Sequence, residues 1–456
     1  MSNFRAVDRE TQYLLPPSVD EWLPEKHLAR YVVEVIEQLD MNVMVKAYRG
    51  SGSQSYHPAM LLGLLIYGYA TGVNSSRKIE RATHDSVAFR YIAANTHPDH
   101  DTLAAFRRRF LPQIEKLFVD VLVLAREMGM LKLGTVALDG TKIHANASRH
   151  SALSYGHAVK IEAQLKLEVS ELMALAEAAD QANIPDGMSI PDELARRSER
   201  LKQIAAAKAK IDARAQERWQ TAQAEYEANM AARDAKTQAV IDAGGKRPGG
   251  KPPSPPSAAP ATTDQINLTD EESRIMPVAG GGFEQSYNAQ AAVAVGSLLV
   301  VGVNVTQAAN DKQQITPMLD ILHAQADRLG QPDTLITDHG FYSVANVNAC
   351  HEAGIAPLLS MGREQHHQSW RERFAAAPLA PIDPTPLEAM AYRFATAEGK
   401  KCYALRKHTP EPVFGIIKSV MGFRQFMLRG LAQVKGEWSL VTMAWNVKRM
   451  FALTAV

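Results

Sequence analysis

Residues 134–148 have the sequence GTVALDGTKIHANAS, and this stretch decides the fold class that the sequence predicts. Its first six residues, GTVALD, form an apolar and partly β-branched run that ends on an acidic residue, as in a short buried strand. We expect this strand to end at Asp139, because Gly140 then lets the backbone turn away. A carboxylate at the end of a buried strand is a candidate functional group.

A second aspartate has the same setting in residues 334–343, TLITDHGFYS. Asp338 directly follows the strand expected at 334–337, and Gly340 comes two residues after it. If the two strands are neighbours, Asp139 and Asp338 project together at one edge of the sheet, where the ligand sites of open α/β sheets usually lie.

The elements around these strands predict a mixed five-stranded sheet with flanking helices, which is an α/β fold. Two strands are expected at 287–295 and 298–306 around a turn at Gly296 and Ser297, and a last strand at 355–359. Helices are expected at 312–329, 343–353, 409–429 and 435–450.

The rest of the chain predicts three further parts. Residues 1–128 form an all-α domain, and residues 155–243, rich in Ala, Glu, Lys, Gln and Arg, form a helical-hairpin insertion. Residues 244–263, GGKRPGGKPPSPPSAAPATT, are a Pro/Gly-rich linker. The predicted catalytic domain then consists of residues 129–154 and 264–456.

Composition limits the classes of protein that remain. The chain has 456 residues, a formal net charge of +1 and two cysteines, which exclude a disulfide framework and a cysteine-rich zinc module. No segment has the pattern of a signal peptide, and the uncharged stretches 59–73 and 289–305 are too short to span a bilayer. These features predict a soluble protein of the cytoplasm.

A third carboxylate, Glu411, lies in residues 406–426, RKHTPEPVFGIIKSVMGFRQF. Thr409 is the expected N-cap of a helix, and Pro410 suits the first turn, where a missing N–H costs no helical hydrogen bond. This predicts a Glu411 fixed on the first helical turn. Lys418 follows two turns later on the same face and could hold a phosphate.

Three carboxylates at such positions suit phosphodiester chemistry, which uses divalent ions held by hard oxygen ligands. Each residue alone has a simpler explanation. An aspartate before glycine is more often a turn residue, a glutamate in a first turn serves the helix dipole, and a lysine is usually solvated.

Taken together, the residues resemble the DDE-type transposases of bacterial insertion sequences, whose catalytic domain is ribonuclease H-like. YALR at 403–406, then Glu411 and Lys418, is similar to the tyrosine, arginine, glutamate, lysine signature of that superfamily, with four residues between Arg406 and Glu411 where three are usual. DGTKIHANAS and DHGFY resemble the settings of its two aspartates. The resemblance implies two Mg²⁺ ions, with Mn²⁺ able to substitute, held by Asp139, Asp338 and Glu411.

The resemblance also implies double-stranded DNA as the partner and assembly as a homodimer or larger complex on it. Residues 397–456 contain ten Lys or Arg against three Glu, a local basic surface that the balanced total conceals. The residues expected to contact DNA are Tyr403, Arg406, Lys418 and Arg424 near the cut, and Arg77, Lys78, Arg107 and Arg108 in the helical domain. A solvated basic face remains the simpler interpretation of the arginines.

The predicted function is therefore a transposase that binds terminal inverted repeats, cleaves the transposon ends by two-metal-ion hydrolysis and joins the 3′-OH ends to target DNA. Such an enzyme would work in the bacterial cytoplasm, associated with the nucleoid when bound to DNA. Two alternatives remain open at this point: a structure-selective ribonuclease H-fold endonuclease, and an inactive DNA-binding remnant.

Overall fold

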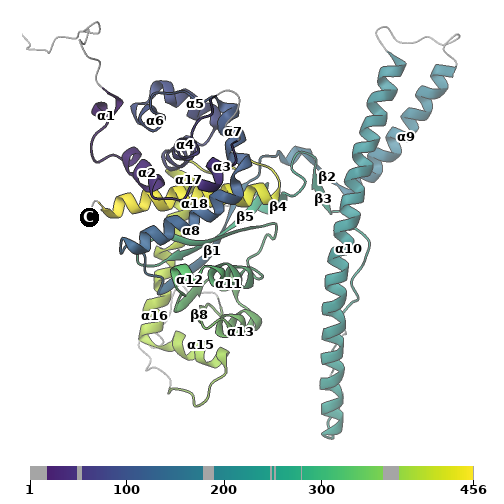
Figure 1. The fold of residues 1–456 in the computed structure, drawn as a ribbon. Helices are drawn as coiled ribbons and strands as arrows, with labels where there is room; N and C mark the ends of the chain where they lie inside the picture. Colours follow the sequence, from purple (N-terminus) through teal and green to yellow (C-terminus); the bar gives the residue numbers. More distant parts are fainter. Residues whose placement is uncertain are drawn as a thin grey trace, which may run out of the picture. The chain divides into compact units, whose positions relative to one another are not determined.

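The computed structural model describes residues 18–48, 54–177, 189–246, 249–250, 253–278, 280–362 and 379–454. The chain divides into two compact units, Met1–Asn146 with Met276–Val456, and Ala147–Ile275. Figure 1 shows the elements of both along the chain. Among the described helices, none combines the length and the apolar character that crossing a bilayer requires.

The first unit contains a mixed sheet in which five strands follow the order β6-β5-β1-β7-β8. The strands are β1 (Thr135–His144), β5 (Phe283–Ala294), β6 (Val300–Thr306), β7 (Thr334–Thr337) and β8 (Ala356–Leu359). β1 pairs antiparallel with β5 and parallel with β7, and β7 pairs parallel with β8. This sheet with its flanking helices confirms the predicted ribonuclease H-like α/β class. A sixth short strand, β4 (Arg274–Pro277), also pairs with β5 and was not predicted.

β1 is longer than predicted, and Asp139 lies in its middle rather than at its end. The strand continues to His144 because β5 provides hydrogen-bonding partners along this length, from Val136 opposite Ala294 to His144 opposite Ser286. At and beyond Asp139, β1 is paired with β5 on one side, whereas its pairing with β7 on the other side ends at Ala137.

One long helix, α18 (Leu431–Thr454), contacts both β6 and the N-terminal helices. It is buried along most of its length. Its indole N–H groups bond to the sheet, from Trp438 to the carbonyl of Gln290 and from Trp445 to that of Leu298, each at 2.9 Å. Apolar residues such as Val434, Leu440 and Val447 are buried around the helix because it lies inside the unit.

The N-terminal residues form helices, as predicted, and these belong to the same compact unit as the sheet. α4, which is buried on nearly all sides, contacts both α2 and α18. The helices are α1 (Val19–Trp22), α2 (Leu28–Glu37), α3 (Asn42–Lys46), α4 (Pro58–Thr71), α5 (Ser76–Asp85), α6 (Val87–Ile92), α7 (His100–Arg109) and α8 (Leu111–Glu127).

Two of the predicted helices that flank the sheet differ in extent, and two further helices within residues 386–404 were not predicted. The helix expected at 312–329 is interrupted at Gln325, and the one expected at 409–429 ends at Ser419, before Gly422, whose φ of +65° is left-handed. The described elements are α11 (Ile315–Ala324), α12 (Ala326–Leu329), η2 (His339–Phe341), α13 (Val344–Glu352), α15 (Pro386–Ala395), α16 (Ala397–Ala404), η3 (Leu405–His408) and α17 (Pro410–Ser419).

The second unit is built on two helices, α9 (Tyr155–Glu177) and α10 (Ile190–Asp242). They share a small apolar core with the two-stranded sheet of β2 (Ala152–Ser154) and β3 (Gln265–Asn267), in which Ile204 and Ile266 are buried. Residues 178–188, where the predicted hairpin would turn, lie outside the described residues. The described part of the 244–263 linker contains no helix or strand.

Candidate active site

The pairing of β1 with β7 brings the two predicted aspartates to the same part of the sheet. Ala137 is opposite Ile336 in the parallel register, so two residues further along each chain lead to Asp139 and Asp338. Because alternate residues of a strand share one face, Asp139 lies on the face of β1 that carries Ala137. Asp338 follows β7 directly and accepts a hydrogen bond of 2.9 Å from the N–H of Gly340.

Asp139 is the carboxylate with the most unusual environment. Burial raises its pKa to about 7, and the negative charges of Asp338 and Asp311 act in the same direction. The N–H of Gly140, which donates to Oδ1 at 2.8 Å, and the positive charge of Arg406 oppose the shift in pKa. A cation beside this group would favour its charged form.

Glu411 lies in the first turn of α17, as predicted, and its side chain is 55% exposed. Nη1 of Arg406 is 3.6 Å from its Oε1. Thr409 precedes the helix, but its side chain does not cap it. Its hydroxyl instead donates a 2.7 Å hydrogen bond to the carbonyl of Leu405, the first residue of η3.

Arg406 is the residue that connects the three carboxylates. Its guanidinium lies over the ring of Tyr403, 5.9 Å from the centroid. The negative charges of Asp139, Asp338 and Glu411 all act to raise its pKa, whereas burial, the largest influence, acts to lower it. The sequence predicted Arg406 only as a DNA contact, but the structure gives it ionic partners within the protein.

Tyr403 was predicted to contact DNA, but the structure places it in the core. It is 9% exposed and packs with Ala137 of β1 and Ile336 of β7. Its ring also contacts Phe394, with 4.9 Å between centroids. We therefore assign Tyr403 a packing role beneath Arg406.

Lys418 has partners inside the protein as well. Its Nζ donates to Oγ1 of Thr141 at 2.5 Å and to the carbonyl of Lys142 at 2.9 Å, so the end of α17 is attached to β1 just beyond Asp139. Burial, together with the charges of Lys142 and Arg424, lowers the pKa of Lys418. Arg424 is exposed, and its Nε donates to the carbonyl of Lys418 at 3.1 Å.

A polar cluster beside Asp139 was missed by the sequence analysis. Oδ1 of Asp311 accepts hydrogen bonds from the amides of Asn288 at 2.7 Å and Gln290 at 2.6 Å, and its Oδ2 is 3.9 Å from Nζ of Lys142. Gly140 faces this cluster: an added Cβ would overlap Nε2 of Gln290 and lie 2.5 Å from Oδ1 of Asp311. Asp311 lies in a loop with no periodic pattern, so only the packing reveals it.

The four N-terminal cations predicted to contact DNA separate into two groups. Arg77, Lys78 and Arg108 are exposed, the first two on α5 and the third on α7. Arg107 is 6% exposed, and its Nη1 donates to the hydroxyl of Tyr69 at 2.7 Å. Arg107 therefore lies inside the protein, unlike the other three, and its DNA contact stays a prediction.

The oxygen donors of Asp139, Asp338 and Glu411 have the chemistry that Mg²⁺ or Mn²⁺ requires. Among the described residues, however, no three His, Cys, Asp or Glu side chains lie close enough to hold an ion together. The arrangement fits a divalent ion in its donor atoms, with the guanidinium of Arg406 interacting with all three carboxylates.

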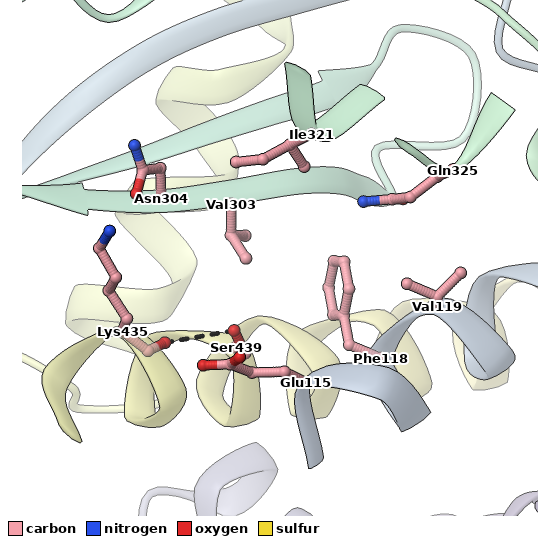
Figure 2. Close-up of a pocket in the computed structure, with 9 residues that line it drawn as sticks. All are labelled: Glu115, Phe118, Val119, Val303, Asn304, Ile321, Gln325, Lys435 and Ser439. Carbon is pink, nitrogen blue, oxygen red and sulfur yellow. Dashed lines mark hydrogen bonds between the residues drawn. The ribbon is translucent and has the colours of Figure 1, made fainter. Parts of the chain in front are cut away.

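A cavity of about 290 Å³ lies elsewhere in the first unit, between α8, β6, α11 and α18 (Figure 2). Phe118, Val303 and Ile321 provide its apolar side, and Glu115 and Lys435 also line it. None of the predicted site residues takes part, so this cavity is separate from the three carboxylates.

Comparison with protein families gives two matches, one at each end of the chain. A family described as a transposase domain (DUF772) matches residues 17–109, and a transposase DDE domain matches residues 383–451. No curated protein and no solved structure matches the chain. The first match includes Arg77 and Lys78, and the second includes Arg406, Glu411 and Lys418. Both matches are to transposase families, and together they support an insertion-sequence DDE transposase.

Proposed function

We propose that this transposase cleaves DNA at the ends of its element and joins the freed 3′-OH ends to target DNA, with Asp139, Asp338 and Glu411 as its metal-binding residues. The observation that carries the proposal is the parallel pairing of β1 with β7, in which Asp139 and Asp338 each follow the opposed residues Ala137 and Ile336 by two positions. Glu411 is linked to them through Arg406.

Each carboxylate would approach a bound metal from a different element. Asp139 comes from the middle of β1 and Asp338 from the end of β7, so the rigid sheet fixes both. Glu411 comes from the first turn of α17, whose last turn Lys418 attaches to β1. Two Mg²⁺ ions, when bound, would activate the attacking oxygen and stabilise the leaving oxygen of the phosphodiester.

We further propose that the exposed cations bind the DNA. Arg77, Lys78 and Arg108 would contact the terminal repeats, and Arg424 would contact the backbone near the cut. The support is their exposure and charge, because cations on a free surface can neutralise phosphates. A homodimer or larger assembly on two ends would follow from the need to join both ends to one target.

The test is a cleavage and joining assay on DNA that carries the element's own ends, with Mg²⁺ or Mn²⁺. We expect Asp139→Ala, Asp338→Ala and Glu411→Ala each to abolish both steps while the fold is kept. Asp327→Ala and Glu398→Ala remove exposed carboxylates of α12 and α16 and are the matched controls. Cleavage without joined products would favour an endonuclease, and salt-sensitive binding without any cut would favour a DNA-binding remnant.

A further inference from the structure

The ring of Tyr403 packs against the guanidinium of Arg406. Its ring packs with Ala137 and Ile336, which precede Asp139 and Asp338 by two residues on their strands. Because the guanidinium of Arg406 lies over this ring, it is held above the part of the sheet where β1 pairs with β7. From there its Nη1 reaches Glu411 at 3.6 Å.

Arg406 is poorly hydrated for a cation. Its side chain is 14% exposed, and its Nε is buried without a hydrogen-bond partner among the residues that the structure describes. A guanidinium remains charged throughout the accessible pH range, so the energetic cost of its burial has to be offset by negative charge nearby. The three carboxylates of the proposed metal site supply that charge.

We infer that Arg406 is an internal counter-cation, which neutralises Asp139, Asp338 and Glu411 in the metal-free protein and competes with divalent ions for them. This inference rests on the proposed function, because it takes the three carboxylates to be the metal ligands. A divalent ion that enters the site has to displace the guanidinium from at least one carboxylate.

The competition has a directional consequence. A cation within a few ångströms lowers the affinity of a carboxylate for a proton by about tenfold or more, and a divalent ion is repelled by the same field. Removing the charge of Arg406 should therefore strengthen metal binding. A residue that only helped to bind the metal, or only kept the protein folded, would give the opposite result.

The experiment measures Mn²⁺ binding to the full-length protein without DNA, by calorimetric titration. We expect Arg406→Gln to bind Mn²⁺ about tenfold more tightly than the unmodified protein. Without metal the variant should melt at a lower temperature, because three carboxylates lose their counter-cation, and saturating Mn²⁺ should remove most of this difference. Lys407→Gln removes an exposed positive charge one residue away and should leave the Mn²⁺ affinity unchanged.

Asp139→Ala separates the two proposals. If it loses Mn²⁺ binding while Arg406→Gln binds no more tightly than the unmodified protein, the counter-cation inference is wrong and the proposed metal ligands stand. If Asp139→Ala binds Mn²⁺ normally, both proposals fail. If Arg406→Gln does not fold, Arg406→Lys replaces it, because lysine keeps the positive charge but lacks the planar guanidinium. A Mn²⁺ affinity between those expected for Arg406→Gln and for the unmodified protein supports the inference. An affinity equal to or weaker than that of the unmodified protein overturns it.

Discussion

The hydroxyl of Tyr69 in α4 donates a 2.7 Å hydrogen bond to Oε1 of Glu437 in α18, inside the core of the first unit. Glu437 is 0% exposed, and its Oε2 accepts the N–H groups of Met427 and Leu428, each at 2.9 Å. Nη1 of Arg107 lies 3.6 Å from Oε1. One buried carboxylate therefore joins the N-terminal helices to the segment that follows α17.

Removing the charge of Glu437 should destabilise the whole unit. Glu437→Gln leaves Arg107 as a buried cation without its counter-ion, so we expect the free energy of unfolding to fall by about 3–5 kcal/mol. Urea denaturation followed by circular dichroism measures this change. Arg107→Met combined with Glu437→Gln removes both charges and should recover most of the loss. A single variant as stable as the unmodified protein would show that the ion pair contributes little.

Gly140 is expected to tolerate no side chain, because the polar cluster of Asp311 occupies the space where a Cβ would lie. In Gly140→Ala either β1 or this cluster has to move, at a cost of about 1–3 kcal/mol. The strand that carries Asp139 is displaced in the first case, so we expect cleavage to fall by more than DNA binding does. Gly296→Ala, in the β5–β6 turn with open space around it, is the control. Equal cleavage rates for the two variants would contradict the prediction.

The sequence predicts best those elements that are determined by residues within or next to the element itself. The β5–β6 hairpin follows from two apolar runs around Gly296 and Ser297, and Asp338 follows directly from the short apolar run of β7. The position of Asp139 within β1 was not predictable in this way. The length of β1 depends on β5, which lies beyond the whole insertion in the sequence.

The candidate site shows the same division. The sequence predicted the three carboxylates and Arg406 as site residues, because a short motif contains Arg406 and Glu411. It could not distinguish Arg107 from Arg108, which are neighbours in an arginine run, because the burial of Arg107 depends on Tyr69 and Glu437. Asp311 likewise acquires a role only where Asn288 and Gln290 of β5 meet it.

The proposed DNA contacts of Arg77 and Lys78 can be tested through the salt dependence of DNA binding. Each phosphate contact contributes about 0.9 to the slope of log affinity against log salt concentration. We expect Arg77→Gln combined with Lys78→Gln to reduce the slope by up to about 2. Arg126→Gln, an exposed arginine of α8, should leave it unchanged. A double variant with an unaltered slope would remove α5 from the proposed DNA surface.

In the second unit, Glu162 should stabilise the pairing of α9 with α10 in a pH-dependent manner. Hydrogen bonds from Lys166 and Lys208, both at 2.6 Å, lower its pKa to about 2. A carboxylate with a lowered pKa contributes stability above its unfolded value, here about 4.5, and this stability is lost as the pH falls towards about 2. Glu162→Gln should therefore speed hydrogen exchange in α9 at about pH 6, and this difference should shrink at about pH 3.

The control for this measurement is Glu225→Gln, an exposed glutamate further along α10. It should leave the exchange of α9 unchanged at both pH values. The prediction fails if Glu162→Gln exchanges at the rate of the unmodified protein at about pH 6, because the two lysines would then contribute nothing measurable to the pairing of the helices.

The two cysteines should differ sharply in reactivity. Cys350 of α13 is 0% exposed, and burial raises the pKa of its thiol to about 12, whereas Cys402 of α16 is partly exposed. At about pH 8 only about one Cys350 in ten thousand would be a thiolate, which is the reactive form. We expect iodoacetamide to modify Cys402 alone in the native protein and both residues in denaturant, as measured by peptide mass spectrometry. Rapid native labelling of Cys350 would mean that α13 separates from the sheet, because no reagent reaches a thiol packed in the core without such opening.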